Sequence, residues 1–298
     1  MMYHEGEIEV QSRAGVRTAA ERLEGGIRST IPEVARDFIA QQPFIVVASV
    51  DADDRVWASI LDGKPGFVSS IDEKSILIQA QPGPSDPLFA TLQPGSYLGL
   101  LSMDFSTRRR MRLNGIVTEI RPGSFRIDAQ EVFSNCPKYI QARKWVQNEM
   151  TDLPEKTTMT SDSLSVEQQD WISEADTFFI ASTHARAGAD ASHRGGNPGF
   201  VKIINKRTIF WDDYAGNNMF QTLGNLARNP AVGLLFVDFQ KGTTLQLSGR
   251  GVVKWKQQAE QGKSGTDRAV QIEIERVIET QTALSLNWIF ENYSPVNP

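Results

Sequence analysis

Cysteine and histidine are the scarcest reactive residues in this sequence. Cys136 is the single cysteine among 298 residues, so the chain cannot form an internal disulfide, which fits a reducing compartment. Three histidines (His4, His184 and His193) and this one cysteine offer few nitrogen and sulfur ligands, which argues against a zinc site. We therefore expect a cytoplasmic protein without a metal centre.

Long apolar runs and an excess of positive charge are also missing. No apolar run approaches the roughly 18 residues that a membrane-spanning helix needs. Residues 1–9 contain three glutamates and no apolar stretch, unlike a signal peptide. The net charge of −5 argues against a protein that coats nucleic acid, because such binding depends on clustered lysine and arginine. We expect partners other than membranes and nucleic acids.

Short apolar stretches separated by polar turns dominate the sequence instead. With 40% hydrophobic and 22% charged residues, the composition is that of an ordinary globular protein, and the length predicts about two domains. Between residues 44 and 133 turn signals recur about every ten residues, a spacing typical of a β-barrel or β-sandwich. We predict a first domain over residues 1–150 and a second over residues 165–298.

Helical patterns are confined to a few segments around these strands. Apolar residues recur every three to four positions, as in helices, in residues 15–29, 30–39, 136–146 and 166–175. Residues 1–14 are expected to be frayed. The polar, threonine-rich segment 151–165 is expected to be the linker between the domains. The sequence thus predicts a mainly β protein with flanking helices.

The two halves of the sequence repeat each other. Pro65-Gly-Phe-Val recurs as Pro198-Gly-Phe-Val, and Ala58-Ser recurs as Ala191-Ser at the same offset. Further matches follow in the same order, among them Val47-Ala-Ser with Ile180-Ala-Ser and Gly99-Leu-Leu with Gly233-Leu-Leu. The alternative, chance similarity of β-rich segments, does not account for this order and near-constant offset. Two copies of one small barrel suggest a pseudo-dimer fused into one chain.

A polar motif in the second copy resembles a phosphate site. It reads Ser192-His193-Arg194-Gly195-Gly196. The Ser192 hydroxyl, the Arg194 guanidinium and the Gly195 amide can surround a phosphate, since the arginine fork binds phosphate through two hydrogen bonds. The alternative is a Gly-Gly loop with a surface arginine.

The first copy lacks this polar set, which favours the functional interpretation. It has Ile60, Leu61 and Asp62 where the second copy has His193, Arg194 and Gly195, so the strand itself does not require them. His193 is a weak candidate for a catalytic acid or base, and a hydrogen-bonding role is the alternative. No carboxylate close to it in sequence would orient its ring.

A polar turn in the second copy is a further candidate for ligand binding. The amides of Asn217, Asn218 and Asn225 and the hydroxyl of Thr222 can donate to phosphate or hydroxyl oxygens. The alternative is that the asparagines only form a turn and that Thr222 caps a short helix.

Basic residues of the first copy could reach the same ligand. Arg110 and Arg112 alternate with Met111 and Leu113, which places both arginines on one side of a strand, facing an anionic ligand across the barrel interface. The alternative is an edge strand guarded by charge. In the segment that follows this barrel, Lys138 and Tyr139 are expected to line the pocket of the second copy. Cys136 beside them is either a reactive thiol or an inert, small buried residue.

Several of these segments together resemble one family. The Pro-Gly-Phe-Val strand, the Asn/Thr-rich turn, Asn229-Pro230 before an apolar strand, the strand Leu245–Val253 and the segment Ala283–Trp288 resemble the pyridoxamine 5′-phosphate oxidase-like proteins. The resemblance implies two tandem six-stranded antiparallel split β-barrels with FMN at the barrel interface. Where better-known oxidases of the family are expected to have a basic pair, residues 217–222 carry amides and a hydroxyl.

The resemblance also implies a function. We expect an FMN-binding flavoprotein, an oxidoreductase that acts on a small molecule together with an electron donor or acceptor. FMN is expected to contact Ser192, His193, Arg194, Gly195, Asn217, Asn218, Thr222, Asn225, Arg110, Arg112 and Lys138. The alternative is a non-catalytic flavin- or ligand-binding or assembly protein of the same fold, and a homodimer of the chain remains open.

Overall fold

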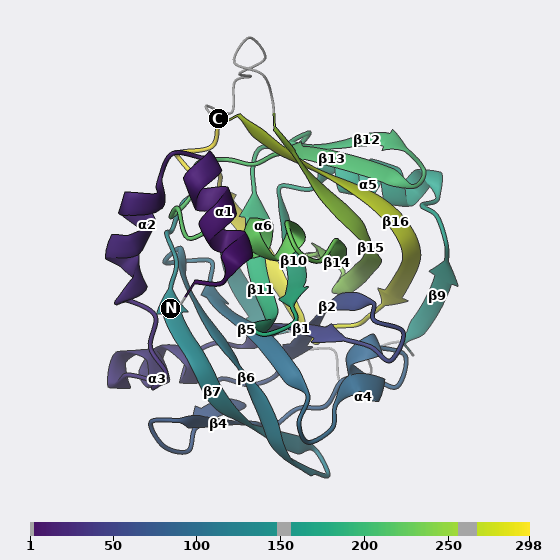
Figure 1. The fold of residues 1–298 in the computed structure, drawn as a ribbon. Helices are drawn as coiled ribbons and strands as arrows, with labels where there is room; N and C mark the ends of the chain where they lie inside the picture. Colours follow the sequence, from purple (N-terminus) through teal and green to yellow (C-terminus); the bar gives the residue numbers. More distant parts are fainter. Residues whose placement is uncertain (1–2, 148–155, 256–266) are drawn as a thin grey trace.

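Two curved antiparallel sheets pack against each other in the computed structural model, which describes residues 3–147, 156–255 and 267–298 (Figure 1). The helices are α1 (Glu5–Arg13), α2 (Arg17–Glu24), α3 (Glu33–Ala40), α4 (Pro87–Thr91), α5 (Val166–Glu174) and α6 (Gln221–Leu226). The first sheet contains β1 (Phe44–Val50), β2 (Val56–Asp62), β3 (Val68–Ser70), β4 (Ser75–Ile78), β5 (Tyr97–Asp104), β6 (Arg109–Arg121) and β7 (Ser124–Ser134).

The second sheet repeats the first. It contains β10 (Thr177–His184), β11 (Gly188–Gly195), β12 (Val201–Asn205), β13 (Thr208–Asp212), β14 (Ala231–Asp238), β15 (Thr243–Trp255) and β16 (Arg268–Gln281). The orders β2-β1-β5-β6-β7-β4-β3 and β11-β10-β14-β15-β16-β13-β12 correspond strand by strand. Within the described ranges each path has seven strands, one more than the six expected. The predicted mainly β architecture with two barrel-like repeats is confirmed.

Hydrogen-bond register supports the repeat residue by residue. Val47 pairs with Ser59 in the first sheet, and Ile180 pairs with Ser192 in the second. These four positions are the ones that the sequence repeat places in correspondence. The two halves therefore share strand order and pairing, which chance similarity of sequence would not produce.

Alternation along the strands divides the apolar residues between three cores. In β1, Ile45 and Val47 face the interior of the first barrel, and Val46 and Ala48 face outward. In β10, Ile180 faces the interior of the second barrel, whereas Phe179 and Ala181 face outward. The outward residues of both sheets form a third core between the barrels. Residues from α3 pack into the first interior and residues from α5 into the second.

Two glycines allow the barrel backbones to approach closely. A Cβ atom on Gly99 would lie 2.6 Å from the Cα of Asp190, and one on Gly233 would lie 2.7 Å from the Cα of Trp57. Gly99 in β5 corresponds to Gly233 in β14, and Trp57 in β2 corresponds to Asp190 in β11. Each barrel thus presents the same contact to the other, as expected for an interface with pseudo-twofold symmetry.

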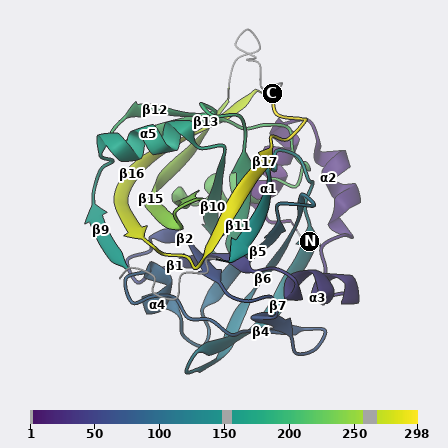
Figure 2. The same cartoon turned by 180° about the vertical axis from the view of Figure 1, so that it is seen from behind.

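Three further strands lie outside the two seven-stranded paths. β8 (Ala142–Gln147) pairs with β17 (Leu286–Asn292), so the last strand of the chain joins the segment that follows the first barrel (Figure 2). β9 (Thr157–Ser161) pairs with β16 at the second sheet. The domain boundaries at residues 1–150 and 165–298 stay a prediction, and β9 lies between them.

Three sequence-based expectations are wrong. Residues 136–146 do not form a helix, because Pro137 lacks an amide hydrogen and Tyr139 has a left-handed φ of 65°, and a strand begins at Ala142. The expected linker 151–165 contains strand β9, while its residues 151–155 lie outside the described residues. The N-terminus is not frayed from residue 3 on, since α1 packs against α6. No helix in the described ranges is long and apolar enough to cross a membrane.

We predict that Gly99→Ala weakens the packing of the two barrels. The added methyl group would overlap the backbone of β11, so the free energy of unfolding should fall by about 1–3 kcal/mol. Gly25→Ala is the control, because a Cβ there meets open space. Denaturant unfolding measures both variants, and equal stability of Gly99→Ala and the wild type would contradict the close contact.

Candidate functional site

A cleft of about 760 Å³, including its part open to solvent, lies where β6 of the first sheet faces β11 of the second. The cleft brings together all predicted binding residues except one, from both barrels: Arg110, Arg112, Lys138, Ser192, His193, Arg194, Gly195, Asn217, Asn218 and Thr222. Only Asn225 lies elsewhere among the predicted residues, and it is buried.

A buried network fixes two arginines of the cleft. Arg112 Nη1 donates to both carboxylate oxygens of Asp190 at 2.9 and 2.8 Å, and its Nη2 donates to Ser192 Oγ at 2.6 Å. Arg194 Nη1 donates to the same Ser192 oxygen at 2.7 Å. Asp190 and Ser192 are two residues apart on β11, so they share a face of the strand. The network therefore joins a first-barrel arginine to a second-barrel arginine.

His193 is held in one neutral form. Arg110 Nη1 donates to His193 Nδ1 at 2.8 Å, so Nδ1 accepts and Nε2 carries the ring hydrogen. Burial, together with the charges of Arg110 and Arg194, keeps the pKa of His193 well below its usual value. The imidazole is therefore neutral at physiological pH and can serve as a hydrogen-bond donor from Nε2.

Four basic side chains, those of Arg110, Arg112, Lys138 and Arg194, line the cleft together with the carboxylates of Asp212 and Asp213. Burial, and then the neighbouring charges of Arg112 and Arg194, lower the pKa of Arg110 to about 9. Burial is also the main cause of a lowered pKa for Arg194. Guanidinium groups this close repel one another, and an anion bound among them would relieve the repulsion.

Unpartnered polar atoms gather in the same cleft. In the part of the chain that the structure describes, most buried side-chain nitrogen or oxygen atoms without a hydrogen bond belong to cleft residues. They are Arg112 Nε, Asn135 Oδ1, His193 Nε2, Arg194 Nε, Trp211 Nε1, Gln221 Nε2 and Thr222 Oγ1. All but the Asn135 oxygen can donate a hydrogen bond. A polar ligand rich in acceptors would satisfy them.

The loop before α6 shapes one wall of the cleft. Asn218 and Phe220 both have a φ of 64°, in the left-handed region, and Asn217 Oδ1 accepts from the backbone N–H of Met219 at 3.1 Å. Phe220 is the N-cap of α6, so Thr222 lies inside the helix and does not cap it. The Thr222 hydroxyl is thereby left for the cleft.

Aromatic residues line the cleft beside these polar groups. The rings of Tyr139 and Tyr214 lie 5.1 Å apart, and those of Tyr214 and Phe200 lie 6.5 Å apart. Tyr139 was expected to line the cleft, whereas Tyr214, Trp211 and Gln221 were not. Cys136, a free and half-buried thiol, also lines it.

The N-terminal helix α1 packs against α6 and the loop that precedes it. Gln11 Nε2 donates to the backbone oxygen of Met219 at 2.9 Å. A Cβ atom on Gly6 would lie 2.2 Å from the Gly224 oxygen, so α1 and α6 meet backbone to backbone. Asn225 belongs to this contact and not to the cleft, because its side chain bonds to His4 and Ser182.

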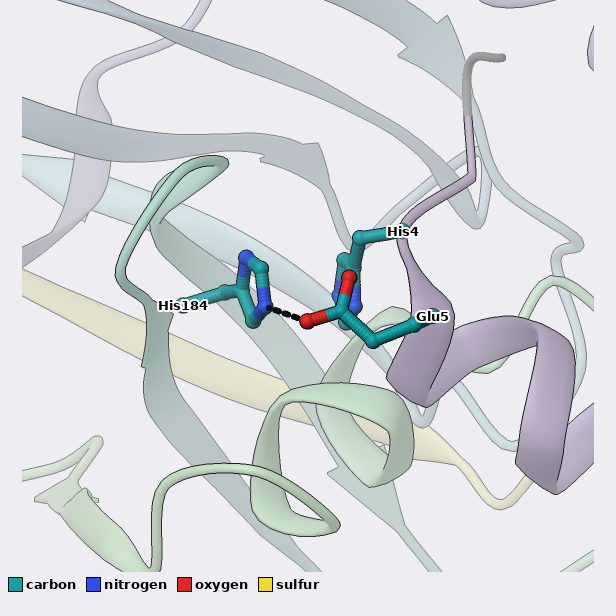
Figure 3. A group of neighbouring side chains, drawn as sticks. All are labelled: His4, Glu5 and His184. Carbon is teal, nitrogen blue, oxygen red and sulfur yellow. Dashed lines mark hydrogen bonds and ion pairs between the residues drawn. The ribbon is translucent and has the colours of Figure 1, made fainter.

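His4, Glu5 and His184 form a cluster with metal-binding residue types at this helix (Figure 3). The two imidazole rings stack 3.9 Å apart. His4 Nδ1 accepts from the Gly6 N–H at 3.1 Å, and His184 Nε2 contacts Glu5 Oε1 at 3.2 Å. Each ring nitrogen of both histidines has a protein partner, so in this arrangement the cluster caps α1 and fixes it to the second barrel.

Glu7 is the buried carboxylate of α1. Its carboxylate accepts from the His4 N–H at 2.8 Å, completing the helix cap. Burial, followed by the nearby carboxylates of Glu131 and Asp190, raises the pKa of Glu7 to about 8. The folded protein therefore holds this proton at neutral pH, whereas the unfolded chain releases it near its ordinary value.

We predict that Glu7→Gln removes a pH dependence of stability. Because native Glu7 keeps its proton up to about pH 8 and the unfolded chain ionises it at about pH 4.5, wild-type stability should fall as pH rises from about 5 to about 8. Glutamine keeps the helix cap and cannot ionise. At pH 8 the variant should be more stable by about 4 kcal/mol. Denaturant unfolding midpoints of both proteins, measured from about pH 5 to about pH 8, test this prediction. Stability profiles that run parallel over this pH range would contradict it.

One comparison with known protein families finds a match in the second half of the chain. Residues 164–287 match the family model described as Pyridoxamine 5′-phosphate oxidase. No similar sequence was found among curated proteins.

Several solved structures are similar to part of this chain. A putative pyridoxamine 5′-phosphate oxidase from Lactobacillus delbrueckii is 14% identical, with 39% of this chain and 94% of that chain covered and a TM-score of 0.33. A FAD-binding protein from Mesorhizobium loti is 10% identical, with coverages of 43% and 98% and a TM-score of 0.31. HutZ, the heme storage protein from Vibrio cholerae, is 13% identical, with coverages of 39% and 92% and a TM-score of 0.29.

Proposed function

Because the second half of this chain belongs to the pyridoxamine 5′-phosphate oxidase-like family, we propose that the cleft between the barrels binds FMN. The observation that carries the proposal is the gathering of unpartnered donors and crowded arginines in one cleft. FMN offers a phosphate, hydroxyl oxygens and a planar ring system, which match this set in charge and hydrogen-bonding capacity. The second barrel supplies most of the contacts, and the first supplies Arg110, Arg112 and Lys138.

The phosphate would be held by arginines and neutral donors together. Arg194 Nε, Gln221 Nε2 and Thr222 Oγ1 are buried donors without a protein partner. Arg110 adds charge to the same cleft, and a phosphate would offset the mutual repulsion that lowers its pKa. This set takes the place of the basic pair expected in residues 217–222 of better-known relatives.

The planar ring would lie against the aromatic part of the cleft. Tyr139, Tyr214 and Phe200 provide ring faces and edges that suit a flat heteroaromatic ligand. Asn217 and Asn218 line the same cleft, and their amides would donate to hydroxyl or carbonyl oxygens of the ligand. These residues bind and orient the ligand and exclude water from one side of it.

Bound FMN would supply two-electron transfer between a small molecule and an electron donor or acceptor. The chain's own part would be binding, orientation and hydrogen bonding. Neutral His193 can donate a hydrogen bond from Nε2, and its low pKa means that almost no imidazolium is present near pH 7 to act as a general acid. This neutral state is the observation that favours the second candidate function, a carrier that binds flavin without turnover.

We predict that Arg194→Ala lowers the affinity for FMN by about ten- to a hundredfold, the effect of losing a charge-assisted hydrogen bond. Fluorescence quenching of FMN measures the affinity. Arg109→Ala is the matched control, because Arg109 stacks on Phe38, away from the cleft. Equal affinity for Arg194→Ala and the control would overturn the assignment of the phosphate to this cleft.

Enzyme and carrier can be separated with the loaded protein. We expect that anaerobic addition of NADH or NADPH bleaches the flavin absorbance and that air restores it, since an oxidoreductase must exchange electrons with soluble partners. Flavin bound in stoichiometric amount but unchanged by both nicotinamides and by other small reductants would favour the carrier.

A further inference from the structure

A second cleft lies at the position that the internal repeat relates to the first. It has a volume of about 780 Å³, including its part open to solvent, and is formed by β2, the loop 80–86 and β15. β2 corresponds to β11, and β15 corresponds to β6. Gln246 pairs with Leu235 on the neighbouring strand, and Arg112 pairs with Leu101 in the same way. Leu235 and Leu101 correspond in the repeat, so Gln246 and Arg112 are counterparts. By the same register Thr244 is the counterpart of Arg110.

The second cleft keeps a hydrogen bond of the first cleft but lacks its positively charged side chains. Gln246 Nε2 donates to Ser59 Oγ at 3.1 Å, as Arg112 Nη2 donates to Ser192 Oγ. Leu61 stands where the second barrel has Arg194. With the arginines replaced by Thr244, Gln246 and Leu61, this cleft has lost the cations that would attract a phosphate.

A carboxylate with no counterpart in the first cleft now faces the second one. Asp86 Oδ1 accepts from Ser59 Oγ at 2.5 Å and from the Leu88 N–H at 2.9 Å. Among the described residues, Asp86 Oδ2 accepts a single hydrogen bond, a long one of 3.4 Å from Gln246 Nε2. A carboxylate oxygen offers about two lone-pair sites, so Oδ2 retains acceptor capacity.

The charge of Asp86 has no cationic partner at bonding distance. No ion pair between described residues includes Asp86. Lys156, at the edge of the cleft, donates instead to the Ala283 backbone oxygen at 2.8 Å. Ile60, Leu61 and Pro82 make the adjacent walls apolar. Asp86 is half-buried beside these apolar walls, and burial raises the pKa of its carboxyl. A cation bound there would stabilise the ionised carboxylate.

We propose that this second cleft binds a small organic cation, a primary amine carried on an apolar group. The ammonium would donate to Asp86 Oδ2 and to the hydroxyl of Thr244, and the apolar group would lie against Ile60, Leu61 and Pro82. The two related clefts thus accept ligands of opposite charge. The proposal rests on the second cleft alone and does not depend on FMN binding in the first.

The test compares three probes of one shape and different charge: benzylamine, benzyl alcohol and benzoate. Methyl NMR shifts of Ile60 and Leu61 report occupancy of the second cleft. We expect benzylamine to shift both signals, benzyl alcohol to bind at least about tenfold more weakly, and benzoate to leave them unchanged. Equal binding of benzoate, or no shift with benzylamine, overturns the proposal.

Two variants test whether benzylamine binds at Asp86 in the second cleft. Asp86→Asn should weaken benzylamine binding by about tenfold or more, and asparagine retains the N-cap of α4, so the fold should persist. Arg194→Ala, in the first cleft, should leave benzylamine binding unchanged while lowering the affinity for FMN. Wild-type benzylamine affinity in Asp86→Asn would overturn the proposal, and failure of FMN binding alone would not affect it.

Discussion

The close contact between the backbones of the two barrels is the constraint on which the rest of this structure depends. Gly99 and Gly233 lie at corresponding positions, and each touches the main chain of the other barrel. This approach brings β6 within reach of β11, so that Arg112 can bond to Asp190 and Ser192. A separation larger by the width of a methyl group would break these short hydrogen bonds. The candidate site is therefore a product of the interface and not of either barrel alone.

Much of this arrangement could be predicted from sequence because the repeat carries it. The recurring Pro-Gly-Phe-Val and the paired Gly-Leu-Leu segments predict that the two halves share one strand order and that Ser59 corresponds to Ser192. The alternation of Arg110 and Arg112 with apolar neighbours placed both arginines on one face, and both line the cleft. Asp190 was missed, although its spacing of two from Ser192 on a strand is a signal for the same face.

Other features depend on contacts that no local pattern encodes. The polar segment Glu5–Arg13 has few apolar residues at helical spacing, and it is ordered by α6, a helix far along the chain. Asn225 has the residue type of a ligand donor, but His4 and Ser182 occupy its side chain. The segment after Cys136 looked helical by spacing, and strand pairing with residues near the C-terminus decides its structure. Long-range partners determine each of these outcomes.

The pairing of β8 with β17 and of α1 with α6 has a consequence for biosynthesis. α1 is translated before the second barrel whose surface it covers, so this contact forms only after α6 has left the ribosome. β8 likewise waits for β17, which follows the whole second barrel in the sequence. The first barrel can assemble its own interior early, but its flanking segments remain unpaired until the second barrel has been synthesised. The contacts that join the two halves therefore form only after both repeats exist.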